Sequence, residues 1–162
     1  MIVRAARETD VPGFLELAAQ VEHWFGPMAD DPGFRAAVDR HIGRSTALVA
    51  VSPQRQVPLG GLLFSVKEAT GAGETPTYHV RWLVVAERAR GRGVGRALLA
   101  AALRRFVRGP GTVEVITFGP DHPGAVASGA RAFYEALGFA PAEAAGAGPE
   151  GGSRQVFRMP LG

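Results

Sequence analysis

A glycine-rich stretch with several arginines is the part of the sequence best suited to bind an anion. It runs Arg-Gly-Arg-Gly-Val-Gly from Arg90 to Gly95, and Arg88 and Arg96 flank it. Glycines permit positive φ and bring the backbone close to a ligand, so consecutive N–H groups at a helix start can bind an anion. Guanidinium groups add bidentate donors that suit phosphate oxygens. The stretch therefore predicts a site for a phosphate or a pyrophosphate.

The glycine stretch lies between a predicted strand and a predicted helix. Residues 78–85 are aromatic and β-branched, which is typical of a strand. After the glycines, apolar residues recur at helical spacing: Leu98, Leu99, Ala102, Leu103 and Phe106. We therefore expect the glycines to join the end of a strand to the first turn of a helix.

Other phosphate-binding and catalytic motifs fit the sequence less well. A P-loop needs Gly-Lys-Ser/Thr, but Lys67 lies far from the glycines, and the dinucleotide pattern needs a glycine where Arg96 stands. No serine has glycines two residues before and after it. The chain has no cysteine, which excludes disulfides and an acyl-cysteine intermediate. No metal site is predicted, because the histidines are isolated from one another: His23, His41, His79 and His122.

The length and composition indicate one globular domain. The chain has 162 residues, enough for one substantial core and few for two, so we expect a single domain over residues 1–162. No apolar run approaches the roughly 18 residues of a membrane span. The first residues are typical of a strand rather than of a secretory signal. We therefore expect a cytoplasmic protein without a membrane partner.

Arginine supplies almost all of the positive charge. Lys67 is the only lysine among 18 basic residues, and the formal net charge is +3. A nucleic-acid-binding protein would carry a broad basic face with stacking aromatics, whereas these arginines concentrate around the glycine stretch and the helix after it. An arginine-rich nucleic-acid-binding protein is thus a less favoured alternative. A coding bias towards arginine is a second explanation of the arginine content.

Apolar periodicity and turn residues predict the other elements. Strands are expected over 2–5, 46–51, 59–67, 112–118, 140–145 and 154–159, with 46–51 and 59–67 paired as a hairpin around the turn region 52–58. One helix is expected after Thr9 or Asp10, with Phe14, Leu17, Ala18 and Val21 on its buried face, and another over 32–43, where His41 lies on the packed stripe. A mobile loop is expected over 146–152. This order predicts a mixed sheet with helices packed on it.

Two segments leave alternatives open. Residues 22–28 break the helical periodicity and gather aromatics, a histidine and an acid, so this loop is either a hydrophobic plug or a wall of a substrate pocket. The last helix starts at Pro123 or, because Gly129 costs about 1 kcal/mol inside a helix, at Ser128. Its predicted face is Val126, Ala130, Phe133, Tyr134 and Leu137.

The glycine stretch and the last helix together resemble the GCN5-related N-acetyltransferase (GNAT) family. Arg90, Gly93 and Gly95 fit its acetyl-CoA signature, and the run Phe133-Tyr134-Glu135 before Leu137-Gly138-Phe139 fits a second signature. The resemblance is strongest over residues 78–139. It implies an α/β acyl-CoA N-acyltransferase fold, with a central mixed, mostly antiparallel sheet of about seven strands and about four helices on its faces.

The resemblance implies an enzyme that transfers an acetyl group from acetyl-CoA directly to a primary amine. It makes Tyr134 the general acid, and His79 lies near where some members carry a base. Glu22, His23, Glu87, Asp121 and His122 are weaker candidates for the base. The implied cofactor-binding residues are Leu83, Val84, Val85, Arg90, Gly91, Arg92, Gly93, Val94, Gly95, Arg96 and Ser128.

The acceptor and the partners follow from weaker signals. Many members carry an asparagine seven residues before the tyrosine, where this chain has Ala127, with Ser128 beside it. Candidate acceptor-pocket residues are Glu22, His23, Trp24, Phe25 and Trp82. The resemblance also admits a homodimer. A catalytically silent CoA-binding module with the same fold is the main alternative.

Overall fold

The computed structural model describes residues 1–54, 58–148 and 151–162. The strands are β1 (Ile2–Ala5), β2 (Ala47–Val51), β3 (Pro58–Lys67), β4 (Thr77–Val85), β5 (Gly111–Phe118), β6 (Ala140–Ala145) and β7 (Arg154–Leu161). The α-helices are α1 (Val11–Ala19), α2 (Glu22–Phe25), α3 (Pro32–Gly43), α4 (Val94–Phe106), α5 (Pro123–Ala127) and α6 (Ala130–Ala136). Two 3₁₀ helices, η1 (Glu8–Asp10) and η2 (Glu87–Ala89), precede α1 and α4. Residues 55–57 of the expected hairpin turn and 149–150 of the expected loop lie outside the described residues.

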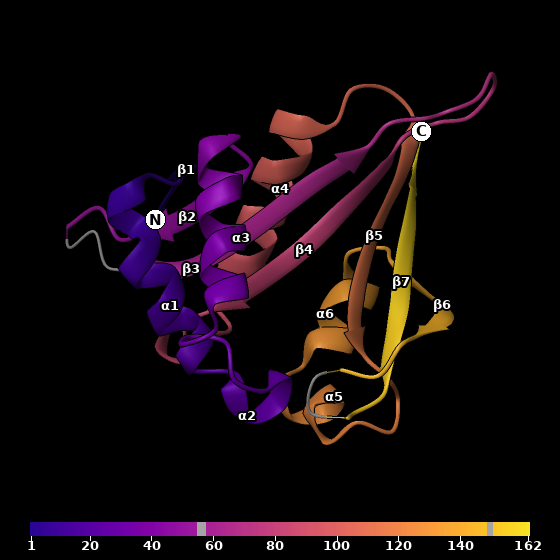
Figure 1. The fold of residues 1–162 in the computed structure, drawn as a ribbon. Helices are drawn as coiled ribbons and strands as arrows, with labels where there is room; N and C mark the ends of the chain where they lie inside the picture. The colour runs from indigo at the N-terminus through magenta and orange to yellow at the C-terminus, as the bar shows by residue number, and fades with distance from the viewer. Residues whose placement is uncertain (55–57, 149–150) are drawn as a thin grey trace. The chain divides into compact units, whose positions relative to one another are not determined.

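The strands form a seven-stranded mixed sheet in the order β1-β2-β3-β4-β5-β7-β6 (Figure 1). The β1–β2, β2–β3, β5–β7 and β6–β7 pairs are antiparallel, while β4 and β5 are parallel. The α/β fold and the mostly antiparallel sheet expected from the sequence are thus confirmed, including the pairing of residues 46–51 with 59–67.

The chain divides into two compact units. The first comprises Met1–His23, Pro27–Phe64 and Arg81–Val107, and the second comprises Trp24–Gly26, Ser65–Val80 and Arg108–Gly162. The expectation of a single domain over residues 1–162 stays a prediction.

In the first unit, β2 is buried on both faces. All five of its residues are buried, and its sequence is a continuous apolar run because each face meets a helix layer. Ala47, Val49 and Val51 belong to a core cluster with Phe14 of α1 and Val38 of α3. Helix α4 also contacts β2. The predicted face of α1 is confirmed, since Phe14, Leu17, Ala18 and Val21 are buried. On the predicted face of α4, Leu98, Leu99 and Ala102 are buried, whereas Leu103 and Phe106 are half-buried.

Two adjacent glycines in β3 let both helix layers of the first unit approach the sheet closely. Adjacent strand residues point to opposite faces. A Cβ on Gly60 would lie 3.0 Å from Leu98 and Val94 of α4, and one on Gly61 would lie 2.8 Å from Phe14 of α1. This packing was not predictable from the sequence, because a glycine within a strand does not identify the side chains that pack against it.

In the second unit, β5 and β7 pair along their whole length and carry helices on one face. Their register runs from Gly111↔Leu161 to Phe118↔Arg154. Val113, Val115 and Thr117 of β5 are buried, whereas Ile116 is exposed, which is the alternation of a strand with one covered face. Helices α5 and α6 both contact β5 (Figure 1).

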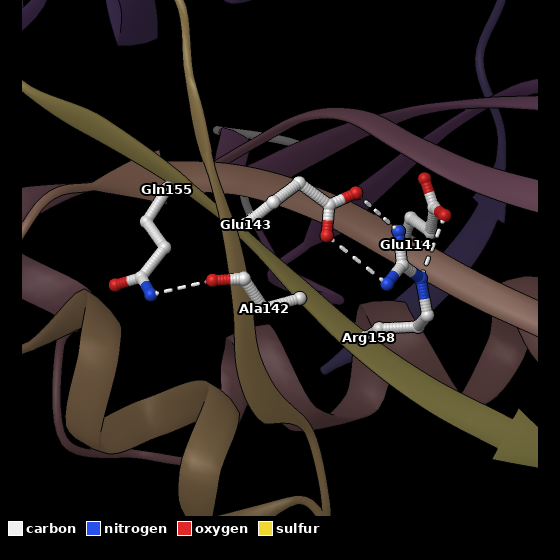
Figure 2. Close-up of polar contacts among 5 residues, drawn as sticks. All are labelled: Glu114, Ala142, Glu143, Gln155 and Arg158. Atoms are coloured by element: carbon white, nitrogen blue, oxygen red, sulfur yellow. Dashed lines mark hydrogen bonds and ion pairs between the residues drawn. The ribbon is translucent and has the colours of Figure 1, made fainter.

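An ion-pair network crosses three strands of the second unit. Arg158 of β7 donates Nε to Glu114 Oε1 of β5 at 2.8 Å, and its two terminal nitrogens donate to Glu143 of β6 at 2.7 and 3.1 Å (Figure 2). The β6–β7 register shifts between Pro141 and Ala144. Bulges and proline discourage pairing with another chain at a sheet edge, so β6 is built as a protected end strand.

Three sequence expectations need correction. Residues 22–25 form the short helix α2 rather than only a loop. The last helix is two helices, because Gly129 adopts a left-handed conformation with φ +69° between them. The start at Pro123 is confirmed for α5, whereas Ser128 is the C-cap of α5 and the second helix begins at Ala130 after Gly129 as its N-cap. Val126 is 91% exposed and does not share the face of Tyr134, since it belongs to α5 rather than to α6. With α2 and α5, more than the expected four helices are present.

No helix in the described parts of the chain is long and apolar enough to cross a membrane.

His41 gives the first unit a predictable response to acid. The ring is 7% exposed, and its Nδ1 lies 2.8 Å from Thr46 Oγ1. Burial lowers the pKa of His41 below its ordinary value of 6.5, and the positive charges of Arg40, Arg44 and Arg81 lower it further. Below pH 6.5 the unfolded chain therefore binds the proton more readily than the folded chain.

We predict that the free energy of unfolding falls as the pH drops below 6.5, and that His41→Gln removes part of this fall. Urea unfolding between pH 7.5 and pH 5 measures it. His23→Gln, at an exposed position, is the control and should keep the wild-type pH dependence. An unchanged pH dependence in His41→Gln would contradict the prediction.

Candidate active site

The glycine stretch of the first unit forms a left-handed turn in front of α4. Gly91 and Gly93 have φ values of +75° and +80°, and a Cβ at either position would meet nothing within 4 Å. Gly93 is the N-cap of α4 and makes no side-chain cap. The first N–H groups of the helix have no intrahelical partner and are thus available to an anion.

Residues 86–88, which precede this turn, form hydrogen bonds to β3 and to the end of α1. Ala86 N donates to Leu59 O of β3 at 2.8 Å, and Glu87 N donates to Oε1 of Gln20, just after α1, at 2.9 Å. Arg88 donates to the carbonyl of Pro58 at 3.1 Å. Gln20 is a supporting residue that sequence reasoning missed, because nothing in the pattern around a helix end reveals a partner 67 residues away.

The exposure of the turn suits a charged ligand. Arg90, Gly91, Arg92, Gly93 and Arg96 are exposed, whereas Val94 and Gly95 are buried under the start of α4. The buried residues anchor the helix while the exposed cations and glycine backbone face solvent. On β4, Val84 is buried, and Leu83 and Val85 are half-buried. Backbone donors, cations and open space together fit a diphosphate group.

Tyr134 of α6 is a buried phenol in an aromatic cluster of the second unit. It is 5% exposed, and its ring centroid lies 5.0 Å from Phe133, 5.4 Å from Phe139 and 6.5 Å from Phe157. Burial raises the pKa of Tyr134 well above its ordinary value of 10.0. No hydrogen bond joins its hydroxyl to another described residue. The side chain therefore holds its proton at neutral pH and has a donor to give.

The side chain of Ser128 forms hydrogen bonds within the connection between α5 and α6. Its hydroxyl donates to Gly124 O and accepts from Ala130 N at 3.2 Å. It thus accepts from the first N–H of the helix that carries Tyr134, although the N-cap of that helix is Gly129. Its predicted role as a cofactor ligand stays a prediction.

The predicted acceptor-pocket residues occupy different environments. Glu22 accepts from Ala29 N and Met28 N at 2.9 and 3.2 Å, and these N–H groups lower the pKa of its carboxyl group. His23 is exposed. Trp24 contacts Phe118 edge to face, with centroids 6.5 Å apart. The side chain of Phe25 lies outside the described residues.

Trp82 is part of the first unit's core. Its ring lies 5.8 Å from Phe14 and 5.3 Å from Phe34, and it packs against the cluster between β2, α1 and α3. Its buried indole N–H has no partner among the described residues. A buried donor without a hydrogen-bond partner costs about 1–3 kcal/mol of stability. An acceptor atom placed against this N–H would therefore stabilise the folded chain.

The base candidates are divided between the two units. Glu22, His23 and Glu87 belong to the first unit, whereas His79 of β4, Asp121 and His122 belong to the second. His79 is half-buried, and its register partner on β5 is Glu114. His122 is buried and accepts from Gly124 N through Nδ1 at 2.8 Å, which makes it a cap of α5. Within the described ranges, no cluster of three histidine or acidic side chains could hold a metal ion.

The comparisons with known proteins agree on one family. The model of the acetyltransferase (GNAT) domain matches residues 43–141. A putative GNAT acetyltransferase from Desulfovibrio desulfuricans has a similar structure, with a TM-score of 0.75, 21% identity and 99% of each chain covered. A ribosomal-protein-alanine N-acetyltransferase from Brucella melitensis has a TM-score of 0.71 and 19% identity, with 99% of this chain and 100% of that chain covered.

A third similar structure contains the coenzyme. A chain of the NatC complex bound to Gag peptide and CoA has a TM-score of 0.73 and 16% identity, with 99% of this chain and 98% of that chain covered. These identities are low, so the structures show the shared fold. No curated protein sequence matches the chain significantly.

The left-handed turn predicts a specific cost for a side chain at Gly93. Gly93→Ala should lower the free energy of unfolding by about 1 kcal/mol or more, because a Cβ is disfavoured at positive φ even where space is open. Gly43→Ala at the end of α3 is the matched control, because a Cβ there also meets nothing within 4 Å and the glycine has no positive φ. That control should be neutral or stabilising by up to about 1 kcal/mol. Guanidinium unfolding of the two variants makes the comparison, and equal effects would contradict the role of φ.

Proposed function

Because the chain belongs to the GNAT acetyltransferase family, we propose that it is an acetyl-CoA-dependent N-acetyltransferase acting directly on a primary amine. The observation that carries the proposal is the exposed left-handed glycine turn at the start of α4, which lies inside the segment that matches the family. The matched segment also contains Tyr134.

The first unit supplies the proposed residues for binding the coenzyme. The N–H groups from Arg90 to Arg96 and the exposed guanidinium groups bind its diphosphate, and the backbone of Leu83, Val84 and Val85 binds its amide arm. A backbone N–H of this strand polarises the thioester carbonyl. When bound, acetyl-CoA supplies the acetyl group as a thioester.

The second unit supplies the proposed proton donor. Tyr134 donates its phenolic proton to the departing sulfur atom, and its raised pKa ensures that the proton is present at neutral pH. An amine with a pKa near 10.4 must lose a proton before it attacks. His79 is the proposed base, acting directly or through water.

The proposal defines the acceptor only by its chemical class, a primary amine. Glu22, His23, Trp24, Phe25 and Trp82 are its proposed neighbours. The Brucella protein is named for acetylation of a ribosomal protein's alanine, and the NatC chain is in a complex with a peptide, so peptide amines belong in any acceptor panel. Cytoplasmic location and a homodimer remain predictions.

The coenzyme-binding residues can be tested without knowing the acceptor. The double variant Arg90→Ala/Arg92→Ala should bind CoA about 100-fold more weakly or worse, because two contacts are lost and each charged hydrogen bond to phosphate contributes about 1.5–3 kcal/mol. Its affinity for pantetheine, which lacks phosphates, should stay unchanged. Isothermal titration calorimetry measures both affinities.

The double variant Arg104→Ala/Arg105→Ala is the matched control for this experiment. Arg104 and Arg105 are exposed in the last turn of α4, so their removal takes away the same two positive charges without touching the turn. An equal loss in this control would indicate general electrostatics. If the wild-type chain binds neither CoA nor acetyl-CoA but binds duplex DNA, the proposed function is wrong.

Tyr134→Phe should lower kcat by about 100-fold while leaving CoA affinity unchanged, because only the transferable proton is removed. Thiol release from acetyl-CoA with a panel of peptide amines, polyamines and amino acids measures turnover. The chain has no cysteine, so a thiol reagent detects only released CoA. Full turnover in the variant would exclude Tyr134 as the acid.

Tyr78→Phe is the control for loss of a tyrosine hydroxyl. Tyr78 is buried in the same unit, and its hydroxyl is bonded to the backbone of Arg108. It should lower stability without a selective fall in kcat. CoA binding without thiol release for any amine would favour the silent CoA-binding module.

A further inference from the structure

Arg131 links helix α6 to the strands beneath it. Its Nη1 donates to the carbonyl of Phe118, the last residue of β5, at 2.9 Å, and to Oε1 of Gln155 on β7 at 2.7 Å. Its guanidinium carbon lies 4.8 Å from the centroid of Phe157, also on β7. One side chain therefore ties the helix to two strands.

Helix α6 needs such an external tie. It has only seven residues, and helices shorter than about 12 residues are marginal without tertiary contacts. Gly129 at its N-cap has φ +69° and makes no side-chain cap. Among the side-chain contacts of the described residues, the connection before the helix supplies the bond from Ala130 N to the Ser128 hydroxyl, and Arg131 adds the contacts to the strands.

The position of Arg131 is electrostatically unfavourable for the helix itself. It lies in the first turn, where the helix macrodipole disfavours a positive charge. Among the described residues its partners are a carbonyl, an amide oxygen and an aromatic ring, without a carboxylate. The contacts to the strands therefore explain this arginine better than local helix stability does.

Arg131 and Tyr134 lie on one face of α6. They are three residues apart, a spacing that places side chains next to each other on a helix. Both contact Phe157, with Arg131 above the ring and the Tyr134 centroid 6.5 Å away. The same strand residue is thus packed against the arginine and against the phenol.

Gln155 connects this tie to strand β6. Its Oε1 accepts from Arg131. Figure 2 shows its other bond, in which Nε2 donates to Ala142 O at 2.8 Å. Ala142 lies in the bulge of β6, where the regular register with β7 is interrupted. The two ends of one amide therefore hold the helix and the bulged strand.

We infer that Arg131 is a positioning residue that sets the orientation of Tyr134, with Gln155 as its partner. The catalytic consequence rests on the proposed function, whereas the effect on Tyr134 itself does not. Arg131 acts through α6 and Phe157, and takes no part in proton transfer.

The chain's two tyrosines allow a direct test that needs no substrate. Tyr78 and Tyr134 are the only ones, so ring-labelled tyrosine gives two sets of NMR signals, which Tyr78→Phe assigns. Arg131→Met should shift or broaden the Tyr134 signals and leave those of Tyr78 unchanged. Arg154→Met is the control: Arg154 neighbours Gln155 on β7, but among the described residues its side chain donates only to Gly146 O, so both tyrosines should be unaffected. An unchanged Tyr134 signal in folded Arg131→Met would overturn the inference.

Variants of Gln155 separate its two hydrogen bonds. Gln155→Glu keeps an acceptor for Arg131 but loses the donor to Ala142, so it should preserve the Tyr134 signals. Gln155→Leu loses both bonds and should disturb them as Arg131→Met does. Equal disturbance in the two variants would mean that the β6 contact, and not Arg131, positions the ring.

Kinetics test the consequence for transfer. Arg131→Met should lower kcat between about tenfold and 100-fold, as expected when a reacting group is misplaced, with KM for acetyl-CoA unchanged. Arg131→Lys, which keeps the cation and one donor, should recover part of the loss. In the Tyr134→Phe background, Arg131→Met should have no further effect, because it acts through that phenol.

An equal fall in both backgrounds would show a general structural role and would overturn the positioning claim. If the wild-type chain transfers no acetyl group, the proposed function fails instead. The tyrosine signals then still decide whether Arg131 sets the orientation of Tyr134.

Discussion

Close approach between helices and sheet at Gly60 and Gly61 is the constraint on which the first unit depends. The absence of a side chain at Gly60 lets Val94 and Leu98 pack against β3, and these two residues begin and anchor α4. A Cβ at Gly60 would also lie 3.0 Å from the carbonyl oxygen of Val84. Gly61 admits Phe14 on the opposite face. Because tightly packed cores tolerate added volume poorly, a larger residue at Gly60 would displace the start of α4 and with it the glycine turn. The proposed anion site, which follows β4, thus depends on a glycine in β3.

Local chemistry made the elements of this fold predictable, and long-range contacts were not visible in the sequence. Periodicity located the strands and the buried faces of α1 and α4, and the Asp31-Pro32 start of α3 appears as a side-chain cap on Gly33 N. Gly129 was recognised as a poor helix residue, yet its left-handed conformation, which divides the last helix, was not foreseen. The error at Val126 follows from that division, since a face is shared only within one continuous helix.

The candidate site was predictable to the same extent. The glycine turn is a local motif, so its place before α4 could be predicted from residues 90–96 alone. The supporting residues Gln20 and Arg131 could not, because their partners Glu87, Phe118 and Gln155 come from other elements, and no local spacing encodes such pairs. The roles assigned to Tyr134, His79 and Ser128 stay predictions, although the burial of Tyr134 meets the requirement for a protonated phenol.

The structure also explains why arginine content is a poor guide to a partner. Several guanidinium groups are bound within the fold: Arg4 forms an ion pair with Asp10, Arg158 bridges Glu114 and Glu143, and Arg131 bonds to Phe118 and Gln155. A planar group with five donors suits such bridging between carbonyls and carboxylates, which lysine would do less well. Arg92 and Arg96 are instead exposed beside the glycine turn. A basic composition can therefore arise from such internal contacts together with the proposed anion site, and it does not by itself indicate nucleic-acid binding, which requires a broad cationic face.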